Sequence, residues 1–265
     1  TRTSMADTTS PDWLTPIRFQ GDDRISFLQG QLTQDIGRLG RDCPALLAAS
    51  CDPKGRVLAV KTLINQPDSL IVALRRELAE QWLTGVLRYK LRSKVDALVA
   101  DDVRVVAVDD AGIPHALAQW RFGSAHEALV SVGQASYDAA AQSRTQRLQN
   151  GVFDIAAHAV GGFTPHMLSL DQVDALSFSK GCYTGQEVVA RTEHLGSVNR
   201  RARLFRATTA ISDAAEQVAM IGDRKTGRLV AGAGDYAAIV VADKDANATH
   251  TLADGNTLQP AKPGS

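Results

Sequence analysis

The pattern of apolar and polar positions changes character at about residue 199. Before this point, apolar runs of strand type alternate with stretches in which apolar residues recur every three or four positions. After it, short apolar runs separated by turn residues predict strands at 200–208, 216–221, 228–233, 236–242 and 249–252. Short strands in close succession are typical of a small β-barrel or sandwich. We therefore expect a mixed body followed by a β domain over residues 199–265.

Strands and helices are intermixed in the body. Apolar runs at 45–51 and 56–65 flank Asp52-Pro53-Lys54-Gly55, a turn sequence, which predicts a β-hairpin. Further strands are expected at 69–74, 94–99, 103–108 and 128–132, and helices from Asp22 or Asp23 to Gly30, around 78–89 and at 137–148. This order predicts helices packed on antiparallel sheets, which is the α+β class.

Residues 180–187 concentrate the chemistry of the chain. They read Lys-Gly-Cys-Tyr-Thr-Gly-Gln-Glu and precede a helical pattern. Thr184 and Glu187 have the spacing of a capping box, which predicts that a helix begins there. Cys182 would then lie just before the positive end of a helix and two residues from Lys180, and both features favour a thiolate. We expect a reactive thiol at Cys182, with a small buried cysteine beside a tight turn as the alternative.

The composition of the chain argues against several classes of partner and site. Lys plus Arg and Asp plus Glu are both 29, so no net charge favours direct binding of nucleic acid. The three cysteines (Cys43, Cys51 and Cys182) have no CxxC spacing, which argues against a disulfide framework and a closed zinc site, and we expect no metal site. No apolar run approaches the roughly 18 residues of a membrane helix, and the N-terminus does not resemble a signal peptide. A cytoplasmic protein without a membrane partner is expected.

Three segments resemble the YgfZ family, folate-binding proteins related to the T-protein (aminomethyltransferase) of the glycine cleavage system. The most specific is residues 180–187, continued by Val-Val-Ala-Arg. The second, residues 27–35, reads Phe-Leu-Gln-Gly-Gln-Leu-Thr-Gln-Asp, and the third, residues 51–56, reads Cys-Asp-Pro-Lys-Gly-Arg. With a looser match over residues 75–95, the similarity extends from about residue 15 to about residue 205.

The resemblance implies a fold that periodicity alone does not give. It implies three domains arranged in a ring, with ferredoxin-like α+β layers, a small C-terminal β-barrel and a folate in the central channel. The first domain would be discontinuous, formed by residues 1–50 and 115–198 and carrying the signature segment. Residues 51–114 would form an inserted middle domain, and residues 199–265 the barrel.

The resemblance also implies a function. The chain would bind tetrahydrofolate, or a one-carbon derivative of it, and would support assembly or repair of iron–sulfur clusters in client enzymes, including enzymes that modify tRNA. Its partners would be folate and these client enzymes or assembly proteins. Cys182 would be the reactive group, with its thiolate stabilised by Lys180. Folate contacts are expected from Gly181, Tyr183, Gly185, Gln186, Glu187, Arg191, Gln29 and Gln31.

Departures from the family patterns leave the reaction open. Residues 163–166 read Phe-Thr-Pro-His where the family usually has Phe-x-Pro-Gln, and Ser169 stands where an asparagine is expected. T-proteins carry acidic residues just after the hairpin, where this chain has Ala59 and Val60. Because an alanine cannot accept a proton from an amine, we expect no glycine cleavage. A one-carbon or aminomethyl transferase acting on another amine, and a scaffold with an inert Cys182, are the alternatives.

Overall fold

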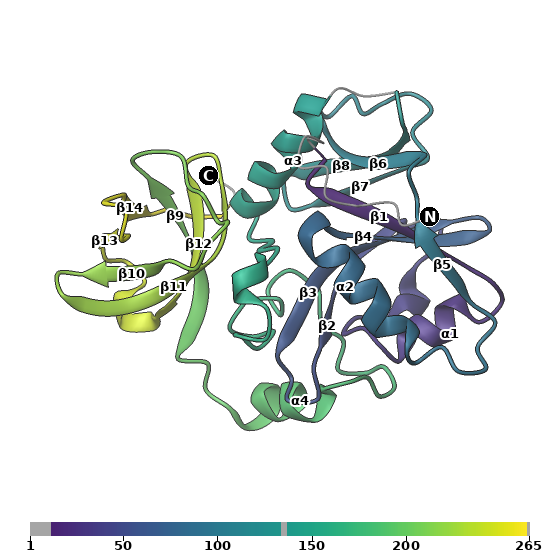
Figure 1. The fold of residues 1–265 in the computed structure, drawn as a ribbon, viewed down its shortest axis with the longest axis horizontal. Coiled ribbons are helices and arrows are strands. Elements are labelled where there is room, and N and C mark those ends of the chain that lie inside the picture. The colour runs from purple at the N-terminus through teal and green to yellow at the C-terminus, as the bar shows by residue number, and fades with distance from the viewer. Residues whose placement is uncertain (1–11, 134–136, 264–265) are drawn as a thin grey trace.

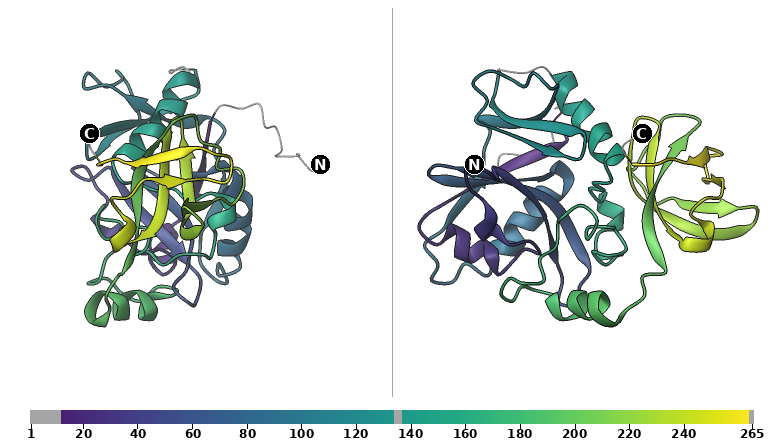
Figure 2. Two further views of the ribbon diagram at one scale, coloured as in Figure 1. Left: turned by 90° about the vertical axis from the view of Figure 1, so that its left-hand side faces the viewer. Right: turned by 180° about the vertical axis from the view of Figure 1, so that it is seen from behind.

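The fold consists of two antiparallel sheets and a closed barrel (Figure 1). It is seen in a computed structural model that describes residues 12–133 and 137–263. The two sheets and their helices form a body, and the barrel stands beside it in Figure 1 and in the right-hand view of Figure 2. The expected α+β architecture with a C-terminal barrel is confirmed. No helix in the described ranges is long and apolar enough to cross a membrane.

The larger sheet has the strand order β2-β3-β4-β1-β5. Its strands are β1 (Leu14–Gln20), β2 (Ala45–Cys51), β3 (Val57–Gln66), β4 (Ser69–Arg75) and β5 (Asp96–Val99). Every residue of β2 and of β4 is buried, so both faces of the sheet are covered. Helix α2 (Arg76–Leu87) packs against β1, β3 and β4 and buries Leu78, Trp82 and Val86, as its periodicity predicts. The short α1 (Arg24–Gln29) ends at Gly30, as predicted.

The sheet extends across an expected domain boundary. β2 and β3 form the predicted hairpin, and their pairing runs from Ala45 opposite Ile64 to Cys51 opposite Val57. The boundary expected between residues 50 and 51 therefore falls inside this hairpin, and a division there would separate two paired strands. The boundary expected at residue 199 directly precedes the first barrel strand, which begins at Arg200.

The smaller sheet has the order β6-β8-β7. It is formed by β6 (Val103–Val108), β7 (Ala118–Phe122) and β8 (Ala125–Ser131), and α3 (Tyr137–Gln149) packs against β6 and β8. Sequence periodicity missed β7, because Trp120 is its one buried residue.

The C-terminal segment forms a closed barrel of order β10-β11-β12-β9-β14-β13. Its core is apolar and centred on Phe205, Leu229 and Ile239. The strands are β9 (Arg200–Ala207), β10 (Val218–Ile221), β11 (Arg224–Ala233), β12 (Tyr236–Ala242), β13 (His250–Thr251) and β14 (Thr257–Pro260). Helix α4 (Gln186–Leu195) precedes the barrel and lies below the body in Figure 1.

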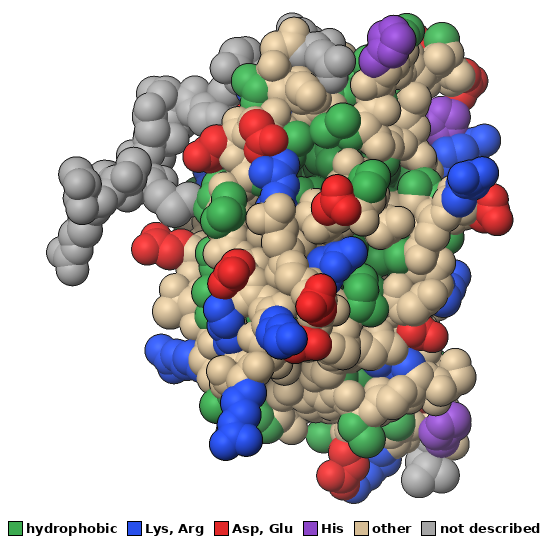
Figure 3. All heavy atoms as spheres, turned by 90° about the vertical axis from the view of Figure 1, so that its right-hand side faces the viewer, with side chains coloured by type: hydrophobic (Ala, Val, Ile, Leu, Met, Phe, Trp, Pro, Cys, Tyr) green, Lys and Arg blue, Asp and Glu red, His purple; other side chains and the backbone are tan. Residues whose placement is uncertain are grey.

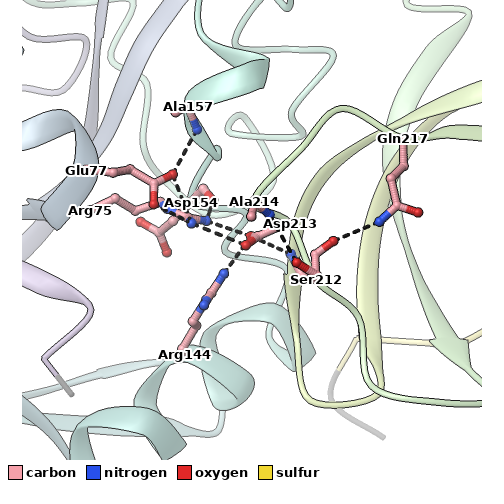
Figure 4. A network of polar contacts seen from close by, with 10 residues as sticks. Arg75, Glu77, Arg144, Asp154, Ala157, Ser212, Asp213, Ala214 and Gln217 are labelled. Atoms are coloured by element: carbon pink, nitrogen blue, oxygen red, sulfur yellow. Dashed lines mark hydrogen bonds and ion pairs between the residues drawn. The ribbon is translucent and has the colours of Figure 1, made fainter. Parts of the chain in front are cut away.

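A buried cluster of ion pairs joins the barrel to the body (Figure 4). Asp213, between β9 and β10, accepts hydrogen bonds from Arg75 Nη1 at 2.8 Å and Arg144 Nη2 at 2.6 Å. It also accepts one from the backbone N–H of Gly232 at 2.9 Å. Arg75 ends β4 and Arg144 lies on α3, so one carboxylate of the barrel segment binds both sheet layers of the body.

Candidate functional site

Lys180 links the signature segment (residues 180–187) by hydrogen bonds to the end of α1 and the loop that follows it. Its Nζ donates hydrogen bonds to the backbone carbonyls of Gln29 at 2.5 Å, Leu32 at 2.6 Å and Gln34 at 3.1 Å. Burial lowers the pKa of Lys180 to about 8. The three N–H donors of the ammonium are thus directed at carbonyl oxygens, which makes Lys180 a positioning residue. The stabilisation of a Cys182 thiolate by Lys180 remains a prediction.

Gly185 brings the same segment against the β2–β3 hairpin. Its φ of +83° lies in the left-handed region, which favours glycine. A Cβ at this position would collide with the carbonyl oxygen of Asp52 and lie 3.0 Å from the Cα of Gly55. The turn of the hairpin and the start of α4 therefore touch through their backbones, with no room for a side chain.

The capping box predicted at Thr184 is wrong. Helix α4 begins at Gln186 with Gly185 as its N-cap, and no side chain caps it. The close contact at Gly185 fixes a left-handed turn there and moves the helix start beyond Thr184. Glu187 instead accepts a hydrogen bond from Arg191 Nη2 at 2.9 Å, one turn later, and both side chains are largely exposed. Gln186 Oε1 accepts one from the backbone N–H of Tyr183 at 3.3 Å.

A groove of about 670 Å³ lies between α2 and the β2–β3 hairpin. This volume falls in the range of about 300–1,000 Å³ that is usual for small-molecule sites. The wall formed by α2 presents Trp82 together with a polar stripe of Glu77, Glu80, Gln81, Thr84 and Arg88. Each of the three segments that resemble the family also contributes to the lining: Gln31, then Cys51, Asp52 and Pro53, then Thr184. Ser50, Leu58 and Val160 line it as well.

The predicted folate contacts divide into two groups. Gln31 lines the groove, as does Thr184 of the signature segment, which was not predicted as a folate contact. Gln29 does not: its Nε2 donates to Asp35 Oδ1 and its Oε1 accepts from the N–H of Ile36, both at 2.8 Å.

The remaining predicted residues lie outside the groove lining. Tyr183 is buried with its ring 5.2 Å from Lys180 Nζ, and burial raises the pKa of its hydroxyl. Cys182 is exposed, two residues before Thr184. The other members of the set are Gly181, Gly185, Gln186, Glu187 and Arg191.

Sequence analysis missed a buried lysine behind the groove. Lys61 Nζ donates to Ser50 Oγ at 2.6 Å and to the carbonyl of Ala59 at 3.0 Å, and lies 4.7 Å from the centroid of the Trp82 ring. Burial lowers the pKa of Lys61 well below its usual value, and burial raises the pKa of the neighbouring Cys51 to about 12. Cys51 is therefore a protonated thiol at neutral pH. A lysine inside the apolar run 57–64 was the signal available in the sequence.

The residues that depart from the family pattern have structural partners. His166 Nε2 lies 2.9 Å from Glu193 Oε2, which ties the loop before the signature segment to α4. Ser169 has a φ of +57° and donates from Oγ to the carbonyl of Ala202 at 3.3 Å. Neither side chain lines the groove. Within the part of the chain that the structure describes, no group of three or more His, Cys, Asp and Glu side chains is arranged to hold a metal ion.

Comparison with known proteins finds relatives in the family that the sequence segments resemble. No protein-family model matches the chain. A "tRNA-modifying protein YgfZ" from Hamiltonella defensa is 30% identical over 227 residues, which cover 70% of this chain and 65% of that protein. Proteins of the same name from Vibrio atlanticus and Aliivibrio fischeri are 29% and 27% identical and cover 75% and 83% of this chain and 69% and 78% of their own lengths. The chain thus spans about two thirds of the first of these relatives.

Among solved structures, the glycine cleavage system aminomethyltransferase T from Bartonella henselae superposes with a TM-score of 0.65. The match covers 95% of this chain and 83% of that one at 12% sequence identity. An identity this low shows the fold alone, and it confirms the T-protein-like architecture expected from the sequence.

Proposed function

Because the chain belongs to the YgfZ family, we propose that it binds tetrahydrofolate or a one-carbon derivative of it in the groove beside α2. The adjacent signature segment, with Cys182, would support the assembly or repair of iron–sulfur clusters in client enzymes. The names of the relatives point to enzymes that modify tRNA as the clients. We place this activity in the cytoplasm.

The observation that supports this proposal most is that three separate sequence segments meet at the groove. Three segments that resemble a folate-binding family are far apart in sequence, yet each contributes to the lining of a single cavity. Lys180 and the contact at Gly185 hold them together. A cavity with an apolar floor and a few convergent polar groups is the arrangement expected of a small-molecule site.

Cys182 is the cysteine best placed for the proposed chemistry. Of the three cysteines, Cys43 is partly buried, Cys51 is buried and Cys182 is exposed. One thiolate cannot hold an iron–sulfur cluster, which usually has four protein ligands. Cys182 would therefore exchange with a sulfur-bearing or one-carbon adduct, or bind iron together with ligands of a partner.

Filling the groove from α2 tests folate binding. Gly85 lines the groove, and a Cβ there would meet no atom within 4 Å. We expect Gly85→Leu to weaken tetrahydrofolate binding at least tenfold in calorimetry, because its side chain occupies the cavity. The same change should stabilise α2, since glycine inside a helix is about 1 kcal/mol less favourable than good helix formers. Loss of binding would then not reflect unfolding.

Gly85→Ala is the matched control for this experiment. It should give a similar gain in helix stability while leaving the groove open and the affinity unchanged. Wild-type protein that gives no heat with tetrahydrofolate would reject the proposed ligand. Unchanged binding by Gly85→Leu would move the site elsewhere.

Replacing Cys182 tests where the chemistry occurs. In a strain that lacks this protein, Cys182→Ala should fail to restore the activity of iron–sulfur enzymes that modify tRNA. Cys43→Ala is the control and should restore it, because Cys43 has no part in the proposed site. Purified Cys182→Ala should bind tetrahydrofolate like the wild type, since residue 182 does not line the groove.

The same variant separates the alternatives. Transfer of a one-carbon unit from methylamine donors to tetrahydrofolate that survives Cys182→Ala would favour a transferase. Full complementation by Cys182→Ala would favour a scaffold with an inert thiol.

A further inference from the structure

The groove has opposite charges at its two ends. Glu80, Thr84 and Arg88 are spaced four residues apart on α2 and its C-cap, so they lie along one face of the helix. At 1.5 Å per residue, Glu80 and Arg88 are about 12 Å apart along the helix axis. Neither side chain has a hydrogen-bond or ion-pair partner among the residues that the structure describes. The nearby Glu77 is already bound by Arg75 at 3.0 Å and by the backbone N–H of Ala157 at 2.8 Å.

Cationic residues continue beyond Arg88. Residues 88–94 read Arg-Tyr-Lys-Leu-Arg-Ser-Lys and contain no acidic residue. Lys90 is paired with Asp96 at 2.8 Å, whereas the exposed Arg92 has no ion pair within the described ranges. Tyr89 lines the groove and is 56% exposed, so it marks the mouth. Figure 3 views the side of the molecule on which α2 ends and shows Lys and Arg side chains gathered at its lower left.

We propose that the groove orients a polyglutamylated folate, with the pterin toward Glu80 and the glutamate tail leaving past Arg88 along residues 88–94. This inference rests on the proposed function and adds a direction and a ligand form to it. The 2-amino group and N3–H of a pterin are adjacent donors that match the two oxygens of a carboxylate. Each added glutamate supplies a further carboxylate, for which guanidinium groups are suitable partners.

Charge complementarity favours this orientation over the reverse one. A glutamate tail directed toward Glu80, which is unpaired within the described residues, would place like charges together, which is unfavourable. A basic segment can also bind nucleic acid, but the acidic end of this groove and its confined volume favour a small ligand with an anionic tail.

Calorimetry with tetrahydrofolate carrying one, three and six glutamates tests the proposal. The wild type should bind the triglutamate at least tenfold more tightly than the monoglutamate, and this gain should shrink as salt is added because the tail contacts are exposed. The double variant Arg88→Gln/Arg92→Gln should reduce the gain to less than twofold. Lys225→Gln, a change of an exposed cation on the barrel, should leave it intact.

Glu80→Gln separates the two ends of the ligand. It should weaken the mono- and triglutamate forms by the same factor and leave their ratio unchanged, since it acts on the pterin alone. Circular dichroism would confirm that each variant is folded.

The outcomes distinguish this inference from the proposed function. Equal affinity of the wild type for one and three glutamates would overturn the inference and leave folate binding in place, whereas binding of no folate at all would overturn both. A gain that persists in the double variant would place the tail elsewhere and overturn the inference. Binding of a short RNA that the double variant loses, with an unchanged glutamate ratio, would assign residues 88–94 to nucleic acid instead.

Discussion

Gly185→Ala is expected to lower the free energy of unfolding by about 2–5 kcal/mol. An alanine forced into the left-handed region costs about 1–2 kcal/mol. The added Cβ would also press on the Asp52 carbonyl, and overpacking of this kind typically costs about 1–3 kcal/mol. Because the obstacle is backbone, a side-chain rotation cannot relieve it. Urea denaturation monitored by circular dichroism measures the loss as a lower midpoint.

Gly181→Ala is the matched control in the same segment. A Cβ at Gly181 meets no atom within 4 Å, and its φ is outside the left-handed region. We expect a change within about 0.5 kcal/mol, as for most surface substitutions. Equal losses in the two variants would mean that the segment resists any added side chain. No loss at Gly185 would mean that the hairpin shifts freely away from α4.

The sequence predicted correctly those elements whose structure depends on interactions between residues close in the chain. The hairpin around residues 52–55 follows from Pro-then-Gly turn chemistry, and the barrel follows from short apolar runs between turns. Three strands escaped prediction as elements: β1, β7 and β14. β1 is largely buried, but Pro16 stands within it, and proline argues against a central strand. β7 and β14 have one buried residue each, Trp120 and Leu258. Such strands are held by pairing with their neighbours, and pairing is not visible in a single-strand pattern.

The errors at the candidate site have a non-local cause. Thr184 and Glu187 have the spacing of a capping box, but contact between Gly185 and the hairpin decides where α4 begins. Gln29 and Gln31 are equivalent in the sequence, yet only Gln31 reaches the groove because Gln29 folds back onto the next turn. The resemblance to a family identified the three segments. Only the structure shows that they lie together around one groove.

Asp213→Asn is expected to lower the free energy of unfolding by about 3–5 kcal/mol. This is the usual effect of removing one partner from a buried ion pair, because the remaining charge stays buried without compensation. The Arg75 side chain is 6% exposed and shares the Asp213 carboxylate with Arg144 (Figure 4). An asparagine retains one acceptor but would turn its N–H₂ group toward a guanidinium. The barrel should loosen from the body.

The same cluster predicts that the stability of the protein falls at low pH. Burial acts to raise the pKa of Asp213, but hydrogen bonds and charges from Arg75 and Arg144 outweigh it and hold the pKa well below its usual value. Asp213 therefore binds fewer protons in the folded than in the unfolded protein, whose carboxyl titrates near pH 3.9. Its stabilising contribution is complete above that pH and is lost progressively as the pH falls below it.

Urea denaturation at pH 7, 4 and 3 would show both effects. The wild type should lose stability between pH 4 and pH 3, and Asp213→Asn should lose less, because the variant has no carboxylate at this position to protonate. Asp235→Asn is the control, since its partner Arg206 is exposed on the barrel surface and screened by water. Equal stability of the two variants at pH 7 would mean that the buried cluster contributes no more than a surface pair. Apolar contacts and the other hydrogen bonds between the two parts, such as that from the backbone N–H of Ala156 to the carbonyl of Val230, would then hold the barrel against the body.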